Sequence, residues 1–219
     1  MAAIEPELQA LKENLLDMLS MVKSQLSNCR KAILEKDSAL AEQVIDDERR
    51  INAQELAMDR DCENLLALHT PVATDLRLVL ATLKITNDLE RIADSAKSLA
   101  KVLKGAGKQE IKWMKELQIP EILEVLIDML KEMGSALKKN DTRPALKAVK
   151  KDEEINDYFK KSIKITLALL KKYPDDGKTI LMLLLMVRNL ERSGDLTKNI
   201  SEEIVFHTEA KVLKHKGAV

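Results

Sequence analysis

The feature that most constrains the fold is an internal repeat, because the second half of the 219-residue chain matches the first. A shift of 104 positions superimposes apolar residues of the two halves: Leu19 on Leu123, Leu26 on Leu130 and Ile51 on Ile155. Farther along, a shift of 101 positions places Leu89-Glu90-Arg91 on Leu190-Glu191-Arg192. A unit of this length exceeds a solenoid repeat. The chain is therefore expected to contain two copies of one compact unit.

Apolar residues within each unit recur at steps of three and four, the period of one face of an α-helix. The chain has only six Gly and five Pro, and it is rich in Ala, Leu, Glu and Lys, which favour helix. Aromatic residues make up 2% of the sequence, so the core must be aliphatic. The clearest stripe opens the chain: Leu8, Leu11, Leu15, Met18, Leu19, Val22, Leu26, Cys29 and Ile33. These patterns predict an all-α protein.

Breaks in the apolar pattern divide the chain into six expected helices. Pro71 ends the second helix, because the residue before a proline resists helical torsions. Asp37 is suited to cap the second helix, and Thr74 or Asp75 to cap the third. Gly105 ends the third helix, since glycine readily adopts the left-handed torsion of a helix C-cap.

These breaks also define the expected domains. Residues 1–104 form the first three-helix unit, residues 105–119 a connector, and residues 120–219 the second unit, with Pro120 in its first turn. Long helices joined by short turns pack antiparallel at shallow crossing angles. We therefore predict two tandem antiparallel three-helix bundles related by internal duplication.

Composition and charge argue against several functional classes. Lys+Arg and Asp+Glu number 36 each, so the chain has no overall attraction for nucleic acid. The lone cysteines, Cys29 and Cys62, predict neither disulfides nor a zinc site. We see no signal peptide, and the longest apolar run, Ile180 to Val187, is too short to span a membrane. We expect a soluble cytoplasmic protein that uses no organic cofactor.

Acidic residues four apart recur at matching positions and are the candidate metal ligands. Glu90 and Asp94 project from one face of the third expected helix, as carboxylates four apart do. Because neighbouring helices of a bundle face each other, such stripes bring oxygen ligands together. Oxygen-rich sets suit magnesium, manganese or iron. The remaining candidates are Glu48, Asp152, Glu191 and Asp195, with Asn52 and Asn156 as weaker ones.

The alternative interpretation is that these acids are ordinary solvated residues. Arg91 and Arg192 are placed to neutralise them. No E-x-x-H ligand motif occurs, which argues against redox catalysis. The three histidines show no base–nucleophile arrangement, so we predict no catalytic residues and no enzymatic activity.

The motifs resemble those of the PhoU family. Two copies of L-E-R-x-x-D at matched positions make the resemblance fairly specific, and it covers nearly the whole chain. The first-repeat segments are Pro71–Arg77 and Asn87–Asp94. The second-repeat segments are Leu190–Asp195 and Asn199–Glu203. The acidic second-helix motifs are Glu48–Asn52 and Asp152–Asn156.

The resemblance implies a regulator of phosphate homeostasis that acts beside the phosphate ABC transporter. It implies negative regulation of phosphate uptake and of the phosphate-starvation response, through contacts with the transporter ATPase subunit and a sensor histidine kinase. It also implies a homodimer that reaches the membrane only through its partners, with iron, zinc or another metal on the acidic motifs in some members. The sequence does not indicate which residues contact the partners.

The chain departs from the family pattern in two respects. Leu196-Thr197 replaces the His-Ala that often follows the second-repeat Asp, and Asn52 and Asn156 stand where many members have Asp. Each Asp-to-Asn change removes a charged ligand and weakens a multinuclear cluster. Two other functions stay open: a metal-dependent helical-bundle enzyme, and a ligand-free helical adaptor of another transporter.

Overall fold

Helices form almost all of the chain in the computed structural model, which describes residues 4–212. The predicted all-α fold is confirmed. In chain order the elements are α1 (Glu5–Glu35), α2 (Ser38–Leu68), α3 (Thr74–Lys104), α4 (Lys108–Glu116), α5 (Ile119–Lys139), α6 (Thr142–Lys172), the 3-10 turn η1 (Pro174–Asp176) and α7 (Gly177–Glu209).

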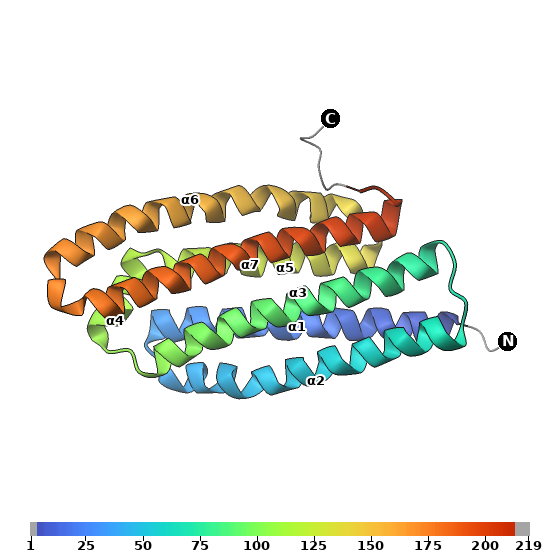
Figure 1. The fold of residues 1–219 in the computed structure, drawn as a ribbon, viewed down its shortest axis with the longest axis horizontal. Helices are drawn as coiled ribbons and strands as arrows, with labels where there is room; N and C mark the ends of the chain where they lie inside the picture. The colour runs from blue at the N-terminus through green and yellow to red at the C-terminus, as the bar shows by residue number, and fades with distance from the viewer. Residues whose placement is uncertain (1–3, 213–219) are drawn as a thin grey trace.

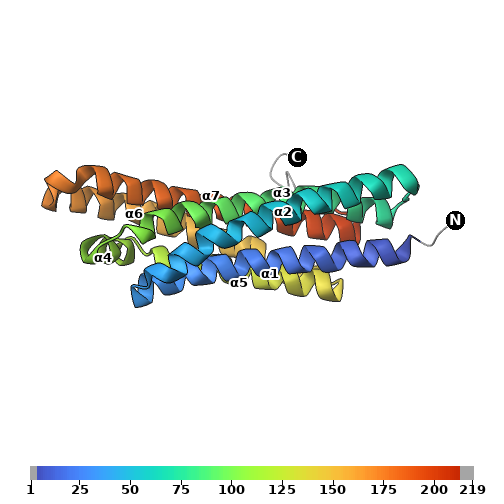
Figure 2. The same ribbon diagram turned by 90° about the horizontal axis from the view of Figure 1, so that it is seen from below.

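The six long helices form an elongated body of two layers (Figures 1 and 2). One layer contains α6, α7, α3 and α2 in that order, and the other contains α5 and α1. Contacts between the two repeats run through α1 with α5 and α3 with α7, so the units share one core. Within residues 4–212, no helix combines the length and the apolar character needed to cross a membrane.

The core is aliphatic, as the composition predicts. In α1 the buried side chains follow the expected stripe, and Leu15, Val22 and Leu26 are completely buried. Each such side chain contributes roughly 1.5–3 kcal/mol when removed from water. Burial of this stripe packs α1 against α2, α3 and α5.

The helix caps agree with the sequence in part. Asp37 accepts a hydrogen bond from the backbone N–H of Ala39 at 2.9 Å and caps α2, as predicted. The prediction for α3 is wrong, because Ala73 is the N-cap residue and no side chain bonds to the helix start. Ala73 has φ 48°, a conformation that costs an alanine free energy, and α3 begins without the help of Thr74 or Asp75.

Gly105 does follow the end of α3, but its predicted left-handed torsion is wrong. Its φ is −99°, and no glycine in the described part of the chain has a positive φ. Left-handed caps occur instead at Lys36 and Asn140, where the chain turns between two long helices.

The segment 105–119 contains a seventh helix that the six-helix prediction missed. This helix, α4, buries Ile111, Trp113 and Met114 against the neighbouring elements. The Trp113 ring lies 5.3 Å, centroid to centroid, from that of Tyr173, just before η1. The segment therefore joins the repeats and also closes one end of the core.

Replacing Trp113 with alanine tests the contribution of α4. We expect the free energy of unfolding to fall by about 3–5 kcal/mol, because a large buried side chain leaves a cavity. Lys112→Ala on the same helix is the control, since the Lys112 side chain is 61% exposed and should change stability by about 0.5 kcal/mol or less. Urea unfolding followed by circular dichroism measures both, and equal effects would contradict the packing of α4.

Candidate metal centre

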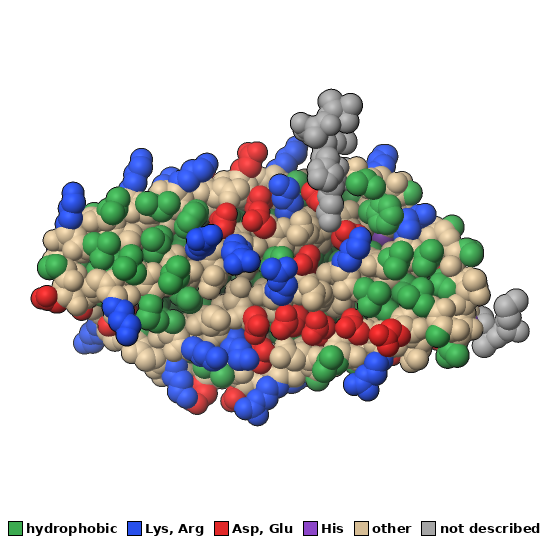
Figure 3. Space-filling model, viewed as in Figure 1, with side chains coloured by type: hydrophobic (Ala, Val, Ile, Leu, Met, Phe, Trp, Pro, Cys, Tyr) green, Lys and Arg blue, Asp and Glu red, His purple; other side chains and the backbone are tan. Residues whose placement is uncertain are grey.

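Acidic side chains line the contact between α2 and α3 in the first repeat, and we call this row the acidic groove. Glu48 comes from α2, and Glu90 and Asp94 come from successive turns of α3. The two helices are direct neighbours, so residues four apart on the facing side of one helix point toward the other. Figure 3 shows the result as a row of acidic side chains along this part of the surface.

The carboxylates of Glu48, Glu90 and Asp94 are close enough to share a cation. Each offers one oxygen atom, and these three atoms lie within 4.8 Å of one another. Glu48 is 3% exposed, and its Oε2 lies 2.7 Å from Nζ of Lys97. Asn52 donates a hydrogen bond from Nδ2 to Oε1 of Glu48 at 2.8 Å, which fixes the carboxylate's orientation.

The protonation of these acids differs with their neighbours. Burial raises the pKa of Glu48, but hydrogen bonds from Lys97 and Asn52 outweigh burial and leave the pKa below its ordinary value. Burial also raises the pKa of Glu90, and the negative charges of Asp94, Glu55 and Glu48 raise it further. Glu90 is therefore surrounded by other negative charges, and a bound cation would reduce the repulsion among them.

Two further acids extend the groove, and the sequence analysis missed both. Glu55 and Asp59 lie on α2, and the charge of Asp59 adds to burial in raising the pKa of Glu55. Glu55 is seven residues after Glu48, two helical turns along the same face. Glu55 and Asp59 are also four residues apart, but their matching positions in the second repeat are not acidic, so a search for acids that recur in both halves passed over them.

The second repeat carries the corresponding residues without forming the same cluster. Asp152 on α6 is 4% exposed, and its Oδ2 lies 3.9 Å from Nζ of Lys198. Its Oδ1 has no hydrogen-bond partner among residues 4–212. A β-carbon at Gly194 would lie 3.0 Å from this Oδ1, so the glycine lets α6 and α7 approach closely here.

Positive side chains offset the negative charge of the matching acids in the second repeat. Burial raises the pKa of Glu191, as do Asp195 and Asp152, but Arg188 and Arg192 oppose the rise. Positions that carry Glu55 and Asp59 in the first repeat carry Phe159 and Ile163 in the second, so two carboxylates are lost. Asn156 favours the ionised form of Asp152 by a hydrogen bond, without adding a charge.

The fold and the groove define a duplicated helical-bundle protein with its acidic site in the first repeat. The chain belongs to the PhoU family, whose PhoU domain matches residues 15–103 and 119–204. Among its curated relatives, the "Phosphate-specific transport system accessory protein PhoU homolog" of Pseudomonas putida is 28% identical over 96% of this chain and 82% of the relative. The accessory protein PhoU of Escherichia coli (strain K12) is 27% identical over 96% of this chain and 87% of its own.

Solved structures agree with this family over nearly the whole chain. The crystal structure of PhoU from Pseudomonas aeruginosa superimposes with a TM-score of 0.86 at 27% identity, covering 95% of this chain and all of that one. The phosphate transport system regulatory protein PhoU from Streptococcus pneumoniae gives a TM-score of 0.83 at 25% identity, covering 96% and 99%.

Glu90→Gln tests the electrostatics of the groove through the pH dependence of stability. Because the pKa of Glu90 is raised in the folded protein, the folded state holds this proton more tightly than the unfolded chain does. Stability therefore falls as the pH rises from about 4.3, the pKa of an unfolded glutamate, through the native pKa. Glutamine does not ionise. We therefore expect Glu90→Gln to be more stable than the native chain at pH 7, with the difference disappearing near pH 4.

Thermal unfolding between pH 4 and pH 8 in chelator measures this difference. Glu63→Gln is the control, because Glu63 is an exposed acid on the same helix as Glu48. A native protein more stable than Glu90→Gln at neutral pH would contradict the charge repulsion assigned to the groove.

Proposed function

We propose that this protein regulates cellular phosphate homeostasis, restraining phosphate uptake and the phosphate-starvation response. The observation that carries the proposal is the end-to-end similarity to proteins named as accessory or regulatory proteins of phosphate transport. The family match includes both repeats. The proposed partners are the ATPase subunit of a phosphate ABC transporter and a sensor histidine kinase, both met in the cytoplasm.

An exposed apolar surface supports action by protein contact. Hydrophobic side chains gather over the end of the molecule where α6 and α7 meet (Figure 3). Five apolar side chains of these helices have exposures between 41% and 57%, and they define the α6–α7 patch: Ile163, Leu167, Leu181, Met182 and Leu185. Contiguous apolar surface of this kind is typical of binding sites. We assign this patch to the transporter ATPase.

The metal is proposed to bind in the first repeat only. Glu48, Glu90 and Asp94 provide oxygen ligands suited to manganese, magnesium, iron or zinc. Lys97 already balances part of their charge, so a cation would have to displace it from Glu48. In this proposal the cation joins α2 to α3 and fixes the surface that the partners meet.

The described residues give little support to the alternative of an enzyme. Burial raises the pKa of both thiols, Cys29 and Cys62, to about 12, so neither is an available nucleophile at neutral pH. His207 is half-buried, and burial followed by the charges of Lys12 and Arg77 lowers its pKa. Its Nδ1 has no hydrogen-bond partner among residues 4–212.

Replacing Leu181 and Leu185 together with aspartate tests the proposed contact. In a strain that lacks the native protein, the native chain should restore repression of phosphate-starvation genes in phosphate-rich medium, and the double variant should not. Leu56→Asp is the control, because Leu56 is 56% exposed but lies on α2, outside the α6–α7 patch. Co-purification with the ATPase subunit gives a second measurement. Normal repression by the double variant would overturn the assigned patch, and failure of the native chain would overturn the proposed function.

Equivalent substitutions in the two repeats test the metal proposal. Glu90→Gln should weaken manganese or zinc binding about tenfold or more, whereas Glu191→Gln at the matching position should leave it nearly unchanged. Lys97→Met should strengthen binding, because it removes the competing charge. Calorimetric titration of chelator-treated protein measures all three. Equal losses from both glutamate variants would contradict a single site in the first repeat.

A further inference from the structure

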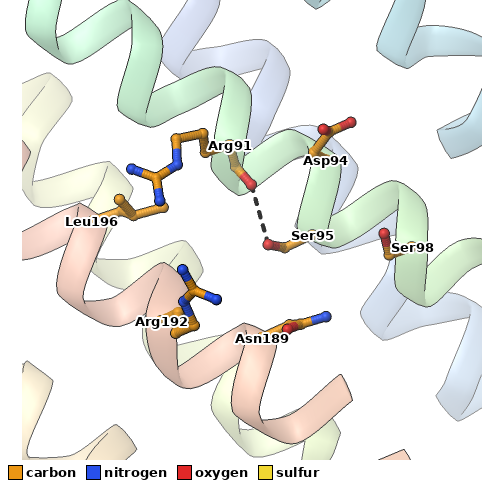
Figure 4. A pocket seen from close by; sticks show the side chains of 7 residues that line it. All are labelled: Arg91, Asp94, Ser95, Ser98, Asn189, Arg192 and Leu196. Atoms are coloured by element: carbon orange, nitrogen blue, oxygen red, sulfur yellow. Dashed lines mark hydrogen bonds between the residues drawn. The ribbon is translucent and has the colours of Figure 1, made fainter. Parts of the chain in front are cut away.

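A second polar feature lies one helix away from the acidic groove, between α3 and α7. It is a cavity of about 230 Å³ that is open to solvent. Figure 4 shows that Arg91 from α3 and Arg192 from α7 extend into the gap from opposite sides. Ser95 and Ser98 on α3, with Asn189 on α7, complete the polar wall.

The two arginines occupy equivalent positions in the two repeats, but they are not equally neutralised. Nη1 of Arg91 lies 3.8 Å from Oδ1 of Asp88, one turn earlier on α3. The residue that matches Asp88 in the second repeat is Asn189, a neutral amide. The Arg192 side chain makes no hydrogen bond or salt bridge with any residue from 4 to 212, although the nearby charge of Glu191 partly offsets its own.

We propose that this cavity binds a tetrahedral oxyanion of the phosphate class, held between Arg91 and Arg192. Two guanidinium groups across a cavity repel each other, and a dianion between them converts the repulsion into attraction. Planar guanidinium groups match phosphate oxygens in pairs, which makes arginine the preferred side chain for such ligands. The Asn189 amide and the Ser98 hydroxyl supply neutral donors, while the Ser95 hydroxyl already donates to the Arg91 carbonyl at 3.1 Å.

Asp94 connects the cavity to the acidic groove. It lines the cavity, yet its carboxylate points away from α7 in Figure 4, and it belongs to the Glu48–Glu90–Asp94 cluster. Its negative charge opposes an anion in the cavity. A cation on the cluster would cancel this charge, so cation and anion should each strengthen the binding of the other. The affinity for tetrahedral dianions follows from the cavity alone, whereas the choice of phosphate rests on the proposed function.

Calorimetric titration of the chelator-treated full chain at fixed ionic strength tests the proposal. We expect orthophosphate to bind with one equivalent per chain, and Arg91→Gln and Arg192→Gln each to weaken it about tenfold or more. Arg188→Gln is the matched control, because Arg188 lies one turn before Arg192 without lining the cavity, and should change affinity less than about twofold. Asp94→Asn should strengthen phosphate binding, because it removes a negative charge that opposes the anion. In a cavity that binds cations, the same substitution would instead weaken ligand binding.

Further ligands separate the possible sources of the phosphoryl group. Tighter binding of glycerol phosphate than of orthophosphate would support the site and identify a phosphoester as its ligand. Equal affinity for sulfate would overturn the choice of phosphate. Absence of saturable binding by all three anions, or an equal loss in Arg188→Gln, would overturn the site itself.

Repression in cells distinguishes this inference from the proposed function. An Arg91→Gln/Arg192→Gln chain that binds no phosphate but represses normally would overturn phosphate sensing by the cavity. A native chain that binds phosphate but does not restore repression would overturn the proposed function alone.

Discussion

The packing of α3 against α7 determines where the polar residues of this protein can stand. Each of these helices has three long neighbours: α1, α2 and α7 surround α3, while α3, α5 and α6 surround α7. Their burial reflects this, since α3 buries thirteen residues and α2, of the same length, only seven. The charged side chains of α3 and α7 are therefore confined to the faces between these contacts. Successive residues turn by about 100°, so Glu90 faces the groove with α2 and Arg91 faces α7.

The sequence alone was sufficient for the architecture, because the signals involved are local or repeated. The apolar period of α1, the break before Pro71 and the matched L-E-R-x-x-D segments need no knowledge of tertiary contacts. What escaped prediction depends on such contacts. Residues 108–116 carry too short an apolar pattern to indicate a helix, and α4 is recognisable only once Trp113 is seen packed near Tyr173. The start of α3 at Ala73 likewise has no capping signal.

The candidate site was predictable to a similar extent. Spacing identified Glu48, Glu90 and Asp94, and their proximity follows from the neighbouring positions of α2 and α3. The same spacing could not reveal that positive side chains offset the acids of the second repeat, since this depends on how the fold places Lys198, Arg188 and Arg192 around Asp152 and Glu191. The role inferred for the two arginines was also inaccessible. A linear sequence shows each beside an acid, whereas the fold places both on one cavity.

The position of Arg91 and Arg192 has a consequence for how a duplicated protein evolves. Sites contained within a repeat are inherited in pairs, and the two copies can then come to differ, as the two acidic grooves do. A cavity lined by the same position of both repeats forms between them instead of within each. Before the duplication, such a cavity would have required two separate chains to meet. Fusion into one chain removes that dependence on concentration, and it frees each wall to diverge independently, as Asp88 and Asn189 have done.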